Sequence, residues 1–185
     1  MIAELLLNVE ECLERYGSFY GIAKRVRSGE LVKLERGLYS DTDEYVSGER
    51  RVSKKHPAAV FTMESAFLFH GLSDVVPDRH SLATPARSAA LADPRVRQWY
   101  VPAGTLDVGR TELEWAGAKL PVYDLERSLV ELMRNRNKVP YDYYKEVLNA
   151  FRANLDRLYP AKLDDYLASF PRRDALSAAL EREVF

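Results

Sequence analysis

Residues 18–40 read SFYGIAKRVRSGELVKLERGLYS, and two different periodicities follow each other along this stretch. In the first half the apolar side chains recur at the spacing of one helix face: Phe19, Ile22, Ala23 and Val26. This pattern predicts a short helix with an apolar inner side, which Ser18 precedes as a preferred N-cap residue. In the second half, two short apolar runs flank residues 35–37, and the glycine that ends this triplet predicts a hairpin turn.

The other side of the predicted helix is polar and basic. Residues 21–37 contain five basic and two acidic side chains, whereas the whole chain has a net charge of -1. A helix fits the major groove of DNA, and a following hairpin can contact the adjacent backbone. The free N–H groups at the start of such a helix also favour a phosphate. The sequence therefore predicts a winged-helix DNA-binding domain over residues 1–45, with these candidate contacts: Ser18, Tyr20, Lys24, Arg25, Arg27, Lys33 and Arg36.

Two questions stay open for this N-terminal region. A basic helix beside a hairpin is also common as an ordinary solvent-exposed surface. A winged helix needs a three-helix core, yet only two helices are evident before the hairpin, over residues 2–16 and from Phe19 onward. Either the first of them breaks near Asn8 or a later helix completes the bundle. Residues 46–57 are polar and of mixed charge, which predicts a linker.

Residues 58–185 alternate between helical and strand-like patterns and are expected to form a second domain. The expected strands cover residues 81–84, 96–101, 112–115 and 120–123. The expected helices begin near Thr62, Asp124, Pro140, Leu163 and Asp174. The mixture predicts an α+β or mixed α/β chain, in which an N-terminal winged helix-turn-helix precedes a C-terminal mixed sheet with packed helices.

Composition excludes several classes of protein. The single cysteine, Cys12, rules out an intramolecular disulfide and suits a reducing compartment. No apolar run is long enough to span a bilayer, and the first residues do not resemble a signal peptide, so a cytoplasmic protein without a membrane partner is expected. The three histidines, His56, His70 and His80, lack the spacing of metal ligands, and no cofactor is expected.

A metal-dependent nuclease is the enzymatic alternative. Asp107, Glu112, Glu114 and Lys119 are the one set that combines carboxylates with a lysine. The lysine lies beyond the turn at Gly117, and the strand alternation does not favour convergence of these side chains. The chain is therefore not expected to be an enzyme.

A dense set of charges follows Asp124. We expect structural ion pairs on this helix, with Arg127 partly buried against a neighbouring carboxylate. Further basic side chains follow along this helix and the next. As a hypothesis, they form a second basic surface that serves the activity of the C-terminal domain: Arg134, Arg136, Lys138 and Arg152.

The chain resembles the AbiEi antitoxin family of type IV toxin–antitoxin systems. The winged-helix opening of that family is similar to residues 16–20, 28–33 and 36–40 of this chain. Its second block is similar to residues 57–60, 64–66 and 70–74 together with Pro77. Its later helices are similar to residues 123–132 and 143–146, so the resemblance covers roughly residues 14–170 in order.

The resemblance implies a DNA-binding antitoxin with two partners. Its N-terminal domain would bind double-stranded operator DNA and repress the antitoxin's own operon. Its C-terminal domain would neutralise a nucleotidyltransferase-like toxin, without a need for direct contact with it. Two non-enzymatic alternatives remain beside this expectation: a stand-alone winged-helix transcriptional regulator, and a protein–protein module whose winged helix no longer binds DNA.

Overall fold

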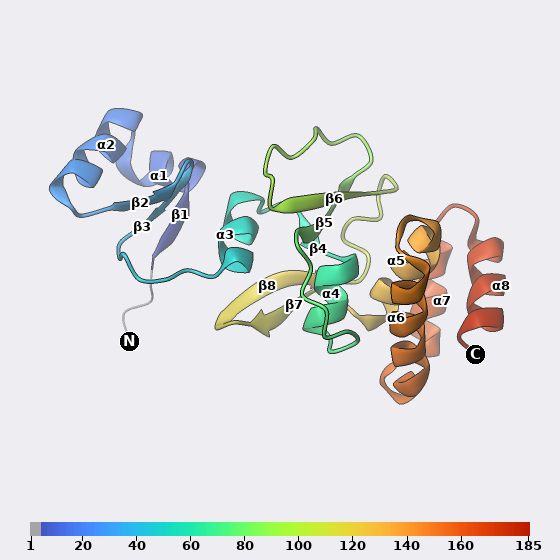
Figure 1. The fold of residues 1–185 in the computed structure, drawn as a ribbon. Coiled ribbons are helices and arrows are strands. Elements are labelled where there is room, and N and C mark those ends of the chain that lie inside the picture. Colours follow the sequence, from blue (N-terminus) through green and yellow to red (C-terminus); the bar gives the residue numbers. More distant parts are fainter. Residues whose placement is uncertain (1–4) are drawn as a thin grey trace. The chain divides into compact units, whose positions relative to one another are not determined.

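The structure is a computed structural model, and it describes residues 5–185. The chain divides into two compact units, residues 1–57 and residues 58–185 (Figure 1). Both contain helices and a sheet, so the fold is mixed α+β, as predicted. Each unit is described by itself below.

The described part of unit 1, residues 5–57, contains a small antiparallel sheet with three helices. Its elements in chain order are β1 (Leu6–Asn8), α1 (Val9–Tyr16), α2 (Phe19–Ser28), β2 (Val32–Glu35), β3 (Leu38–Ser40) and α3 (Gly48–Lys55). The strands lie in the order β1-β3-β2. The β2–β3 hairpin is present where it was predicted, and Gly37 in its turn has a φ of 84° that suits glycine.

The helix predicted over residues 2–16 is interrupted at Asn8, one of the two alternatives that the sequence leaves open. Residues 6–8 form a strand, and the Asn8 side chain accepts a hydrogen bond from the Glu11 N–H while the Glu11 carboxylate accepts one from the Asn8 N–H. This reciprocal capping box begins α1 at Val9. The part of the predicted helix before Leu5 lies outside the described residues.

The prediction of a linker over residues 46–57 is wrong, because this segment contains α3 and belongs to unit 1. Ser47 caps α3, and Val46 and Val52 are fully buried. Lys54 in α3 forms an ion pair with Glu11 of α1. One buried valine within a basic, eight-residue helix gives too weak a periodicity to be recognised in the sequence.

Neighbouring side chains of β1 supply two separate cores. Leu7 packs with Cys12, Ile22 and Leu31, whereas Leu6 belongs to a second cluster with Leu38 and Val46. Successive side chains of a strand point to opposite faces, so the sheet of unit 1 buries apolar surface on both sides.

Unit 2 is built on a five-stranded mixed sheet in the order β6-β5-β4-β8-β7. The strands are β4 (Val60–Phe61), β5 (His80–Pro85), β6 (Val96–Val101), β7 (Arg110–Trp115) and β8 (Ala118–Tyr123). β4 runs antiparallel to β5 and parallel to β8, while β7 and β8 form an antiparallel hairpin. The sequence predicted every strand of this sheet except the two-residue β4.

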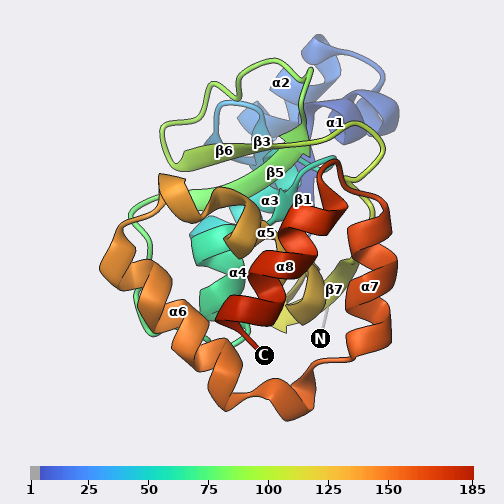
Figure 2. The ribbon, with the colours of Figure 1, turned by 90° about the vertical axis from the view of Figure 1, so that its right-hand side faces the viewer.

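Five helices accompany this sheet: α4 (Met63–Phe69), α5 (Leu125–Asn135), α6 (Tyr141–Ala153), α7 (Pro160–Ala168) and α8 (Arg173–Glu183). Two short 3-10 turns, residues 136–138 and 155–157, flank α6. Helices α5–α8 gather on one side of the sheet (Figures 1 and 2), and their apolar faces form one large core together with α4.

Arg127 of α5 is fully buried in unit 2. Its Nε donates to Glu131 Oε1 at 3.0 Å and its Nη1 to the carbonyl oxygens of Thr105, at 2.6 Å, and Val108. The guanidinium also lies between the rings of Tyr123 and Phe170, at 4.1 and 4.6 Å from their centroids. The structural role expected for this charged helix is therefore confirmed, and the burial of Arg127 is complete rather than partial.

Candidate nucleic-acid interface

The outward face of α2 is continuous along the helix. Its exposed side chains are Phe19, Tyr20, Ala23, Lys24, Arg27 and Ser28, a set related by steps of one and four residues. Phe19 is 67% exposed and Tyr20 73%. The sequence pattern had assigned Phe19 and Ala23 to the inner side, so the helix is rotated relative to that expectation.

The inner face of α2 explains this rotation. Ile22 is buried, and Gly21 faces the end of α1 so closely that a Cβ atom there would lie 2.4 Å from the Tyr16 carbonyl oxygen. Gly17, with a φ of 77°, ends α1 and brings the two helices together. Because α1 covers the side of α2 that carries Gly21 and Arg25, the side that carries Phe19 and Ala23 remains open.

Ser18 begins α2 as the sequence predicted. Its Oγ accepts a hydrogen bond from the Gly21 N–H at 3.1 Å, and no acidic residue occurs in the first turn of the helix. The hydroxyl of Ser18 is thus used for capping, while the positive end of the helix dipole carries no carboxylate of its own. This arrangement can attract a phosphate.

Four of the predicted DNA contacts are exposed cations. Lys24 and Arg27 lie on α2, Lys33 lies on β2, and Arg36 lies in the hairpin turn. Arg27 is held by its Nε, which donates to the Ala23 carbonyl at 3.3 Å. Among residues 5–185, no carboxylate forms an ion pair with any of these four side chains. Their charge is therefore available to an anionic partner.

Arg25 does not belong to this exposed set. Its guanidinium lies 4.5 Å from the centroid of the Tyr16 ring, its Nη1 donates to the Gly21 carbonyl at 3.4 Å, and its Nε lies 3.9 Å from the Glu30 carboxylate. These contacts hold the half-exposed side chain against α1. The prediction of Arg25 as a groove-facing residue is corrected in favour of a supporting role for α2.

We expect Arg25→Ala to destabilise the helix pair α1–α2, because it removes the stacking on Tyr16. The free energy of local opening should fall by about 1 kcal/mol, the usual value of a half-exposed cation–π contact. The control Lys24→Ala should leave this free energy unchanged. Hydrogen exchange of the α1 and α2 amides measures both. Equal protection in the two variants would contradict the supporting role of Arg25.

An apolar groove runs beside the exposed face of α2. It encloses about 300 Å³ and is lined by Phe19, Ile22, Ala23, Val26, Arg27, Lys33 and Tyr39. Apart from the two cations, Arg27 and Lys33, its lining residues are aliphatic or aromatic. This groove was not predicted, because the apolar spacing of α2 indicates a stripe that the core covers completely.

The second basic surface proposed from the sequence is not assembled as a free patch. Arg134 donates to both oxygens of the buried Glu131 at 2.6 Å. Arg136 forms an ion pair with Glu183 at 3.2 Å, and Arg152 donates to the Glu183 backbone carbonyl at 2.9 Å. Of the four, Lys138 and Arg152 are exposed, and Arg134 and Arg136 are partly buried. Internal carboxylates thus occupy two of these cations, and the hypothesis of a four-residue patch is corrected.

The residues of the nuclease alternative lie on the β7–β8 hairpin. Glu112 and Glu114 alternate along β7, and Lys119 is the register partner of Glu114 on β8, so these three share one face of the hairpin, which sequence alternation had not indicated. All three are solvent-exposed, and Asp107 pairs with Arg110 instead. Within the described part of the chain, no three His, Cys, Asp or Glu residues are grouped as a metal site.

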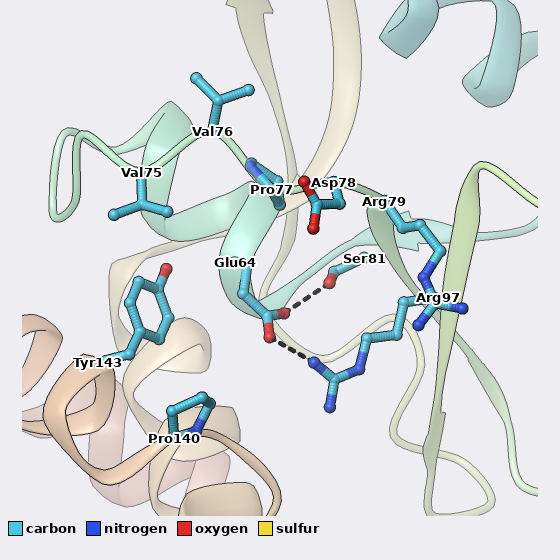
Figure 3. Close-up of a pocket in the computed structure, with 10 residues that line it drawn as sticks. All are labelled: Glu64, Val75, Val76, Pro77, Asp78, Arg79, Ser81, Arg97, Pro140 and Tyr143. Carbon is cyan, nitrogen blue, oxygen red and sulfur yellow. Dashed lines mark hydrogen bonds and ion pairs between the residues drawn. The ribbon is translucent and has the colours of Figure 1, made fainter.

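A pocket of about 390 Å³ in unit 2 was not predicted (Figure 3). Glu64 forms its polar floor, accepting hydrogen bonds from Ser81 Oγ at 2.6 Å and from Arg97 Nη1 at 2.8 Å. Burial raises the pKa of Tyr143, on its wall, to about 12. Both oxygens of Glu64 are occupied, and the arrangement resembles a structural ion pair more than a general base.

Comparison with known proteins bears on the fold alone. No protein-family model and no curated protein matches the chain. Among solved structures, the crystal structure of the RV2827C protein from Mycobacterium tuberculosis is similar, with a TM-score of 0.60 and 16% sequence identity over 96% of this chain and 71% of that chain. In residues 5–185 no helix combines the length and apolarity needed to cross a membrane.

Proposed function

We propose that the chain is a cytoplasmic DNA-binding antitoxin, in which unit 1 binds operator DNA and represses the chain's own operon while unit 2 neutralises a nucleotidyltransferase-like toxin. One observation carries the DNA-binding part: the exposed face of α2 and the adjoining hairpin present Lys24, Arg27, Lys33 and Arg36 without carboxylate partners. Neutralisation of phosphates by such cations supplies most of the affinity of a protein for duplex DNA.

The order of elements in unit 1 supports a winged helix. Two helices, α1 and α2, are joined by a short turn that contains Gly17, and a hairpin follows directly. In helix-turn-helix proteins the second helix enters the major groove with its N-terminal residues against the base edges. Here the second helix is α2, and the hairpin beside it takes the place of the wing. Helix α3 packs against β1 and β3 and is a third helix in the described part of unit 1.

The antitoxin part of the proposal rests on the resemblance to the AbiEi family. The block at residues 123–132 forms the end of β8 and most of α5, where Arg127 and Glu131 hold the helix to its surroundings. These residues are therefore structural supports rather than contact residues for a toxin. A stand-alone winged-helix regulator shares the same DNA-binding unit and differs only in what unit 2 does.

The experiment that tests the proposal uses the full chain and the DNA upstream of its own gene. We expect nuclease footprinting to reveal a protected sequence, and the logarithm of the affinity to fall with the logarithm of salt concentration by about 0.9 for each phosphate contacted. Where a neighbouring gene encodes a nucleotidyltransferase-like toxin, coexpression of the full chain should restore the growth of cells that express this toxin. Absence of protection and of salt dependence would refute DNA binding, whereas protection without restored growth would favour the stand-alone regulator.

A further inference from the structure

The outward face of α2 is apolar at its beginning and basic towards its end. Phe19, Ala23 and Arg27 follow each other at intervals of four residues and form one row along the helix. Tyr20 and Lys24 form the neighbouring row. Two large aromatic rings exposed on the first turn of a short helix are apolar surface that the core of unit 1 does not use, and such surface commonly marks a binding site.

The surroundings of Phe19 and Ala23 indicate what this apolar part of α2 can bind. Both residues line the groove between α2 and the sheet, and the charged residues that line this groove are Arg27 and Lys33. A fitting partner therefore combines apolar groups with nearby negative charge. The major groove of DNA has this chemistry where it contains thymine, because the C5-methyl group is apolar and phosphates border the groove on both sides.

We propose that Phe19, together with Ala23, recognises thymine C5-methyl groups in the major groove, so that Phe19 determines a preference for T·A pairs at the operator positions facing the start of α2. The inference rests on the proposed DNA binding and adds the residue that reads the base. Phenylalanine and alanine are side chains that make apolar contacts with the thymine methyl. The cations farther along the helix and on β2 would bind the flanking phosphates and contribute no preference for a base.

Replacement of thymine by uracil tests this inference, because uracil lacks the methyl group and keeps the same base pairing. Duplexes are first isolated with the full chain by in vitro selection from a random library, and matched duplexes are then made with deoxyuridine at each thymine in turn. We expect one or two replacements to lower the affinity of the unaltered chain about fourfold each, the effect of one buried methyl group. Phe19→Ala should bind the thymine and uracil duplexes equally at the position that Phe19 contacts, because the shorter side chain no longer reaches the methyl group.

The controls separate this inference from the proposed function. Tyr45→Ala removes another exposed ring of unit 1, 85% exposed and outside α2, and should retain the full sensitivity to uracil. Hydrogen exchange of α2 in Phe19→Ala verifies that the helix persists. Salt-dependent binding of the unaltered chain with no effect of any uracil overturns the inference and leaves DNA binding intact. Unchanged DNA affinity of Phe19→Ala on both duplexes also overturns it and assigns the exposed rings to a protein partner. Failure of the library to enrich any duplex overturns both.

Discussion

Replacement of Lys24, Arg27, Lys33 and Arg36 by alanine in one variant is expected to lower the affinity for operator DNA on the order of ten-thousandfold at 0.1 M salt, since each phosphate contact contributes roughly tenfold under that condition. None of the four side chains forms an ion pair within residues 5–185, and all are exposed, so the fold of unit 1 should persist. The slope of log affinity against log salt concentration should become shallower by about four. Fluorescence anisotropy with a labelled duplex over a series of salt concentrations measures both quantities.

A matched control removes the same amount of charge from exposed positions of unit 2. The control variant replaces Arg79, Arg87, Lys119 and Arg173 by alanine, all of them exposed. A general effect of net charge predicts equal losses in the two variants, whereas a contact surface on α2 and the hairpin predicts a loss in the first only. An unchanged salt slope in the first variant would contradict the assignment of DNA binding to this surface.

The sequence was sufficient to find α2 and the hairpin but not to orient the helix. Apolar spacing assigns Phe19 and Ala23 to the core and, by default, places arginine outside. In the structure their placement is the opposite: Phe19 is exposed and Arg25 packs against Tyr16. The reason is that α1 packs against the side of α2 that carries Gly21. A glycine inside a helix lowers the stability of that helix by about 1 kcal/mol relative to alanine. The presence of Gly21 in the predicted helix was therefore a local sign that another helix packs closely against it.

Other features depend on residues that are distant in the chain, which local patterns do not relate. The floor of the unit 2 pocket joins Glu64 to Arg97, and α3 is attached to α1 through Lys54 and Glu11. Each pair is separated by more than thirty residues. In contrast, Asn8 and Ser18 act on amides only three residues away, and their capping roles are readable from the sequence.

Arg127→Met is expected to destabilise unit 2 by about 3–5 kcal/mol, the usual effect of removing one partner of a buried ion pair. Methionine keeps much of the length of the side chain but donates no hydrogen bonds. The carbonyl oxygens of Thr105 and Val108 would lose their donor in a buried environment, and Glu131 would retain Arg134 alone among its arginine partners. Stacking on the Tyr123 and Phe170 rings would also be lost.

Urea unfolding followed by tryptophan fluorescence measures this effect in the correct unit, because both tryptophans, Trp99 and Trp115, lie in unit 2. The matched control is Arg110→Met, which removes an exposed ion pair with Asp107 and should cost less than about 1 kcal/mol. A loss below about 1 kcal/mol for Arg127→Met would show that packing alone holds α5 in place.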